Sequence, residues 1–398
     1  MSRSERHEGD SMQLEPFAYH LAIADRLERT EPDLWHWFQR KHGGERYREL
    51  TKADLASRAD PVDREGTLGR RYKLAETARD RLSIDVPVTL FRLREAAVRV
   101  QPFLVFIPDA VCIVLPIDSA ERRDDDDEWL ATVGREIARH RLYTAQDGRV
   151  HVATCMLQWR VRQEECPPEI IETLRRLTLA SEAYSDIGGY IACESRSAAM
   201  RALLHTDPGA TPEDAEAYLS LTDRPDAAAE SADRPAIPLE LSARAGVLAR
   251  STAGSDPNID ITGLLPSTIE LGALDLLDQE TVCNLTREVL ARVLAEPATG
   301  MLAATAQARE MFPDASVIPD RKPLDHVSPS LSASVIEYLA FLLLDLATAE
   351  GTRLRDSIAV AAAAADELGI GPRFREIARQ ELRGRRGLQA GLATRRAA

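Results

Sequence analysis

The side chains best suited to chemistry lie in two short segments. The first, residues 133–140, reads VGREIARH. It places the carboxylate of Glu136 between Arg135 and Arg139. Positions four residues apart share one face of a helix, so the two arginines point the same way. A carboxylate can act as a general base. Arginine keeps its positive charge and offers no lone pair, so neither Arg135 nor Arg139 can bind a metal.

A second segment, residues 180–189, reads ASEAYSDIGG and spaces Glu182 and Asp186 as ExxxD before two glycines. Two short apolar stretches, Pro102–Ile107 and Ala110–Leu115, precede both segments and favour a pair of strands. This order of strand pair, GxExxx helix and ExxxD helix resembles soluble members of the HtpX/CAAX-prenyl-protease family. Those proteins are gluzincin metallopeptidases with an HExxH zinc motif.

The resemblance covers roughly residues 16–250 and implies a zincin-like domain with a degenerate site. Glu136 matches the catalytic glutamate and becomes a vestigial general base. Arg135 and Arg139 stand where the two zinc histidines stand, and Glu182 and Asp186 match the family's ExxxD. With two of three ligands lost, we expect no bound metal and no other cofactor. The expected function is that of a pseudo-peptidase, a peptide- or protein-binding scaffold that could pair with an active metallopeptidase paralogue.

Three arrangements of these residues remain open. In the first, Arg135, Arg139 and Glu182 form a charge-assisted cluster that replaces the metal as the link between two helices. In the second, both arginines point to solvent. In the third, His140, His151 or a cysteine joins Glu182 in a rewired zinc site, and the chain is a metal-dependent hydrolase with Glu136 as its base. His140 lies about 100° round the helix from Arg139 and points away from the expected site.

The surrounding pattern predicts an α+β fold that is mostly α. Helical periodicity runs from Pro16 to about Asp80, then from Trp129 to Leu142, and from Pro167-Pro168 to about Cys193. Val86–Leu93 adds a third strand to the strand pair, and Val150–Met156 reads as a further short strand after a loop near Asp147-Gly148. Gly188-Gly189 predicts close packing of two helices.

Composition narrows the function classes. The 398 residues carry a net charge of −14, which disfavours binding to a nucleic-acid backbone. Five cysteines without a CxxC pair fit reduced thiols in a cytoplasm, and Cys155 and Cys193 read as buried structural thiols. The most apolar run, Val335–Leu346, contains two acidic residues and is too short to cross a membrane, so no membrane partner is expected.

The chain is expected to divide into a disordered tail (1–15), the metallopeptidase-like domain (16–250), a linker (251–263), an all-α domain (264–384) and a second disordered tail (385–398). Residues 325–383 resemble the TerB-like helical module. In that family an acidic patch can hold a divalent ion, and the nearest candidates here are Asp345, Glu350 and Asp356. A plain helical docking domain is the alternative.

Overall fold

The computed structural model describes residues 14–95, 101–117, 125–207, 210, 215–222, 239–253, 261, 263–295, 302–312, 324, 331–349 and 354–382. The chain divides into two compact units, Met1–Leu265 (unit 1) and Pro266–Ala398 (unit 2). The border follows the segment expected as a linker, most of which lies outside the described residues.

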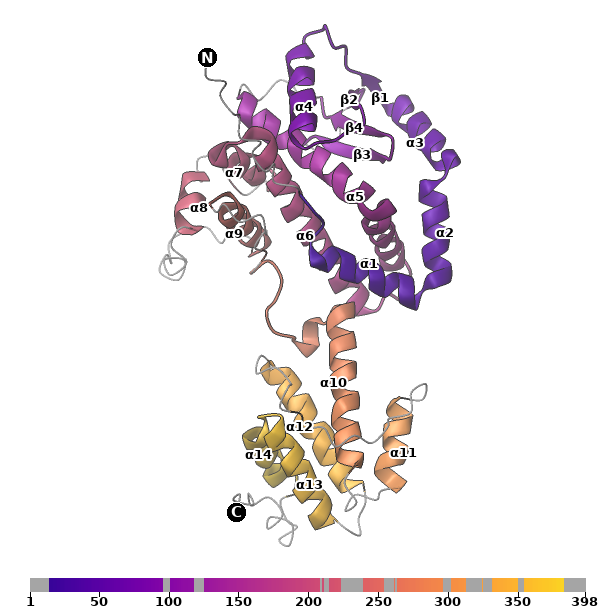
Figure 1. Ribbon diagram of the computed structural model, residues 1–398, viewed down its shortest axis with the longest axis vertical. Helices are drawn as coiled ribbons and strands as arrows, with labels where there is room; N and C mark the ends of the chain where they lie inside the picture. The colour runs from indigo at the N-terminus through magenta and orange to yellow at the C-terminus, as the bar shows by residue number, and fades with distance from the viewer. Residues whose placement is uncertain are drawn as a thin grey trace, which may run out of the picture. The chain divides into compact units, whose positions relative to one another are not determined.

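Unit 1 is built around two long helices, α5 (Asp126–Val161) and α6 (Pro168–Cys193), which pack along one another (Figure 1). The Asp125 side chain accepts hydrogen bonds from the backbone N–H groups of Asp127 and Glu128 in the first turn of α5, and a proline opens α6. The periodicity of the sequence predicted α6 and the first half of α5. Around them lie α1 (Ala18–Thr30), α2 (Pro32–Gly43), α3 (Glu45–Arg58), α4 (Gly69–Arg81), α7 (Arg196–Leu204), α8 (Ala215–Thr222) and α9 (Leu239–Ala253).

The helix α5 is broken at Ala145–Gly148, where Gln146, Asp147 and Gly148 adopt positive φ values. This break confirms the loop expected near Asp147-Gly148. The strand expected at Val150–Met156 is wrong, because this stretch forms the second half of α5. Its residues are buried almost without interruption, so packing against neighbouring helices overrides the β preference of valine and threonine.

The sheet of unit 1 has the strand order β1-β2-β4-β3. Its strands are β1 (Ala59–Pro61), β2 (Val88–Leu93), β3 (Phe103–Ile107) and β4 (Ala110–Leu115). β3 and β4 form an antiparallel hairpin, and β4 runs parallel to β2. The last three strands were predicted, whereas the three-residue β1 was missed. One face of the sheet packs on α4 and α5, the other packs on α3, and β3 lies at an edge beside α5.

Small residues let α5 and α6 approach closely. A Cβ on Gly189 would lie 2.8 Å from the carbonyl oxygen of Ala131, and a Cβ on Gly134 or Gly188 would collide with an alanine side chain. The close packing predicted for Gly188-Gly189 is therefore confirmed. This contact sets the polar side chains of the two helices opposite one another.

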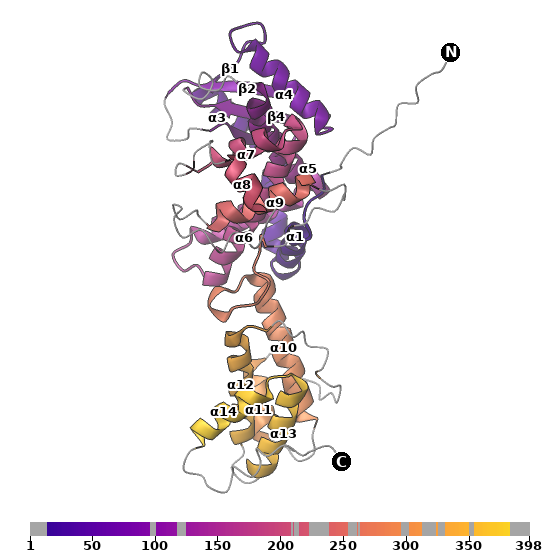
Figure 2. The same cartoon turned by 90° about the vertical axis from the view of Figure 1, so that its left-hand side faces the viewer.

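The remaining helices of unit 1 complete one side of α6. Figures 1 and 2 both place α7, α8 and α9 together, and α9 packs directly on α6. At the start of the described chain, Leu14 is buried, and its carbonyl accepts hydrogen bonds from Arg141 and Tyr184. Leu14 therefore does not belong to the disordered tail that was expected over residues 1–15. Residues 1–13 lie outside the described residues.

The regular elements among the described residues of unit 2 are all helices. They are α10 (Leu276–Leu294), α11 (Leu302–Met311), α12 (Ala333–Thr348), α13 (Leu354–Glu367), α14 (Gly371–Glu381) and a short helical turn, η3 (Leu271–Ala273). Their shared core is aliphatic, with Phe374 as its largest buried side chain. Asp345 and Asp356 are exposed. Glu350 and the tail expected at 385–398 lie outside the described residues.

Throughout the described part of the chain, no helix has both the length and the apolar character needed to cross a bilayer.

Candidate functional site

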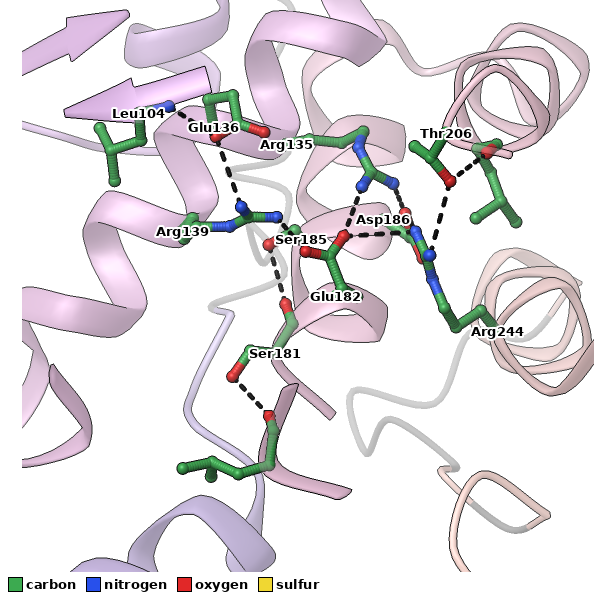
Figure 3. A network of polar contacts seen from close by, with 12 residues as sticks. Leu104, Arg135, Glu136, Arg139, Ser181, Glu182, Ser185, Asp186, Thr206 and Arg244 are labelled. Carbon is green, nitrogen blue, oxygen red and sulfur yellow. Dashed lines mark hydrogen bonds and ion pairs between the residues drawn. The ribbon is translucent and has the colours of Figure 1, made fainter. Parts of the chain in front are cut away.

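The residues singled out in the sequence meet at the contact between α5 and α6 (Figure 3). Arg135, Glu136 and Arg139 project from α5, and Glu182 and Asp186 project from α6. The close approach of the two helices brings these side chains within ion-pair distance. We call this group, together with Arg244 described below, the arginine–carboxylate network.

Glu182 takes one arginine on each of its carboxylate oxygens. Arg135 Nη2 donates to Oε2 at 2.8 Å, and Arg139 Nη2 donates to Oε1 at 2.6 Å. Arg135 also pairs with Asp186 through its other terminal nitrogen. The pairing expected between both arginines and Glu182 is thus present. The arrangement with both arginines in solvent is wrong, since their side chains are only 6% and 20% exposed.

A third arginine, Arg244 on α9, completes the network. It binds Asp186 in a bidentate manner, with Nε at 2.8 Å from Oδ2 and Nη2 at 3.0 Å from Oδ1. Its Nη2 also lies 3.4 Å from Oε2 of Glu182. Sequence reasoning missed Arg244, because 58 positions separate it from Asp186 and no local spacing links them. The candidate residues contained three carboxylates but only two arginines, and this imbalance was the only sign in the sequence that a further basic residue completes the group.

Charge and burial explain why the network is complete. Three arginines face three carboxylates, Glu136, Glu182 and Asp186. The Asp186 side chain is 1% exposed and that of Arg135 is 6% exposed. Charges so far from water are tolerated only when they are paired and hydrogen-bonded. Removing one member of the network would leave a buried charge without its partner, which would destabilise the junction of α5, α6 and α9.

The electrostatics keep the network ionised at neutral pH. Burial by itself would raise the pKa of Glu182, but Arg139, Arg135 and Arg244 together lower it to about 2. Burial and then the charge of Arg244 lower the pKa of Arg135 to about 10. Both groups remain charged at pH 7, so the ion pairs persist under ordinary conditions.

Glu136 is held in a different way. Its Oε2 accepts a hydrogen bond of 2.9 Å from the backbone N–H of Leu104 on β3 and lies 3.7 Å from Nη1 of Arg139 (Figure 3). The side chain is only 7% exposed. The carboxylate thus fastens the edge strand β3 to α5. A peptide added along this edge would need the same N–H group of Leu104.

The side chains considered for a rewired zinc site lie away from Glu182. His140 is buried, and its Nε2 lies 3.0 Å from the carbonyl oxygen of Ile107 at the end of β3. His151 and Cys155 lie beside His42 of α2, in the one place where metal-binding side chains gather among the described residues. Arginines occupy the neighbourhood of Glu182, so the residues present there do not fit a zinc ion.

Comparison with known proteins adds no relative: no family model, no curated protein and no solved structure matches the chain.

Proposed function

We propose that the chain is a catalytically inactive, metallopeptidase-like protein that works as a protein-binding scaffold in the cytoplasm. The proposal rests on the resemblance of residues 16–250 to the gluzincins and on one observation. At the positions that match the family's zinc histidines in this resemblance, Arg135 and Arg139 are ion-paired with Glu182. Arg135 also pairs with Asp186, which binds Arg244.

The chemistry of this arrangement disfavours hydrolysis. A hydrolytic zinc site needs a cation with a bound water and a carboxylate free to take its proton. Guanidinium groups would repel such a cation, and each Glu182 oxygen already binds an arginine. The Glu136 carboxylate is engaged by Leu104 and Arg139. We therefore assign the network the task of joining α5, α6 and α9.

The surface of unit 1 favours a protein partner. Trp37 on α2 is 44% exposed, Trp159 near the end of α5 is 40% exposed, and both rings contact Phe38. Exposed tryptophans are enriched at the centres of protein interfaces. A peptide bound as an added strand is less favoured, because Glu136 already occupies the Leu104 N–H. The partner could be an active metallopeptidase paralogue.

The net charge favours a protein over a nucleic acid as the partner, and the free thiols agree with a location in the cytoplasm. The net charge of −14 disfavours nucleic acid. All five cysteines are free, as expected in a reducing compartment.

Two assays test the proposal. When a peptide library is incubated with the full chain or with Glu136→Gln, both are expected to show the same background level of peptide cleavage. Cleavage by the full chain that the Glu136→Gln substitution abolishes would contradict the proposal. A partner held by the immobilised chain is expected to be released by Trp37→Ala or Trp159→Ala. Ile171→Ala, which removes another exposed apolar side chain, serves as the control. Equal partner retention by all these variants would refute the assigned surface.

A further inference from the structure

A second cluster of reactive side chains lies between α2 and the second half of α5. His151 and Cys155 are four residues apart on α5 and share one face, and His42 faces them from the end of α2. The Cys155 Sγ lies 3.6 Å from Nε2 of His151 and 4.0 Å from Nδ1 of His42. The ligand atoms of all three residues lie within 4.8 Å of one another.

These distances suit one small cation. In a tetrahedral zinc site with Zn–S and Zn–N bonds of about 2.3 and 2.0 Å, sulfur and nitrogen ligands lie about 3.5 Å apart. The sulfur–nitrogen separations found here are close to that value, so small side-chain adjustments would place all three atoms on one ion. Imidazole and thiolate are also the ligand types that select zinc over magnesium or calcium.

The polar groups of the cluster have weak partners without an ion. Among the hydrogen bonds of the described residues, the ring nitrogens of His42 and His151 contact only the Cys155 sulfur. His151 is 8% exposed. Buried imidazoles are usually satisfied by stronger donors or acceptors than a thiol. A bound cation would satisfy both rings at once.

Aromatic rings fix the two imidazoles in place. Phe38 stacks on His42 with centroids 5.6 Å apart, and Phe106 packs against His151 at 4.1 Å. Tyr143 also borders His151, at 5.1 Å. Such packing limits ring rotation, which lowers the entropy lost when the rings bind an ion.

We propose that His42, His151 and Cys155 form a zinc site that ties α2 to the second half of α5. It is separate from the arginine–carboxylate network and does not depend on the function proposed above. The three residues supply three ligands, which leaves a fourth position for water. Because His42 comes from α2 and the other two ligands come from α5, a bound ion would link these two helices.

The protonation of the ligands follows from zinc chemistry. Zinc binds imidazole as a neutral ring and cysteine as a thiolate. Binding at this cluster therefore breaks the Cys155 S–H bond, forms a Zn–S bond and passes one proton to the buffer.

The test uses the full chain, stripped with a chelator and titrated with zinc, or with cobalt as a spectroscopic probe. We expect one ion per chain, release of about one proton per zinc at pH 7, and a thiolate-to-cobalt absorption band. Cys155→Ser is expected to abolish the band. Cys155→Ser and His42→Ala are each expected to weaken zinc binding by more than about 100-fold. His42 is only partly buried, so its variant remains usable if a His151 variant fails to fold.

Matched controls change the same residue types outside the cluster. His36→Ala alters an exposed histidine of α2, and Cys166→Ser alters a thiol in the loop before α6. Both are expected to leave zinc binding unchanged, as is Glu182→Gln in the arginine–carboxylate network. The proposal is overturned if the full chain binds no stoichiometric zinc. It is also overturned if binding survives both Cys155→Ser and His42→Ala, or if the controls weaken it equally.

Discussion

The lowered pKa of Glu182 predicts how the stability of unit 1 depends on pH. Its pKa falls from an ordinary 4.5 to about 2 in the folded chain, where the arginines outweigh the effect of burial. A depressed carboxyl pKa adds stability that is fully present above about pH 4.5 and is lost as the pH falls towards 2. The size of the shift corresponds to about 3 kcal/mol. We expect Glu182→Gln to lower the free energy of unfolding by about this amount at pH 7.

Urea unfolding followed by tryptophan fluorescence measures this effect. All four tryptophans lie in unit 1, so the signal follows that unit. The difference between the native chain and Glu182→Gln is expected to shrink from pH 5 to pH 2, because Glu182 then becomes protonated in the native chain. Glu164→Gln, which alters an exposed carboxylate before α6, is expected to show no such convergence. A Glu182→Gln variant that is as stable as the native chain at pH 7, or a difference independent of pH, would refute the reasoning.

Three further substitutions test the network and its setting. Asp186→Asn leaves Arg135 without one buried partner and is expected to cost about 3–5 kcal/mol in urea unfolding, whereas Asp60→Asn in an exposed arginine pair is expected to change little. Gly188→Ala is expected to lower the melting temperature through overpacking worth about 1–3 kcal/mol, and equal melting temperatures would contradict the close contact of α5 with α6. Glu136→Leu is expected to speed amide hydrogen exchange at Leu104 more than Glu136→Gln does, since glutamine keeps an oxygen that can accept the hydrogen bond; equal exchange in both variants would argue against that bond.

Much of the α5–α6 junction could be predicted from the sequence, because its determinants are local. Apolar periodicity marked the helices, and runs of β-branched residues marked three of the strands. The i, i+4 spacing put Arg135 and Arg139 on one face, and the resemblance set that face opposite Glu182. The paired glycines predicted the close contact that makes these ion pairs possible.

The features that were missed depend on contacts between distant segments. Arg244 reaches Asp186 from α9, and His42 reaches Cys155 across 113 positions. Neither contact leaves a spacing that can be read along the chain. The strand expected at Val150–Met156 failed for a related reason: burial on all sides, rather than local preference, decided its conformation.

The most direct test of the central claim is the zinc content of the Cys155→Ser chain, alone and combined with Arg135→His and Arg139→His. Using Cys155→Ser removes any contribution from the cluster at His42. We predict no zinc in the single variant. In the combined variant residues 135–139 read HExxH opposite Glu182, and we predict about one zinc per chain. Zinc that stays in the Cys155→Ser chain and is lost on adding Glu182→Gln would contradict the account.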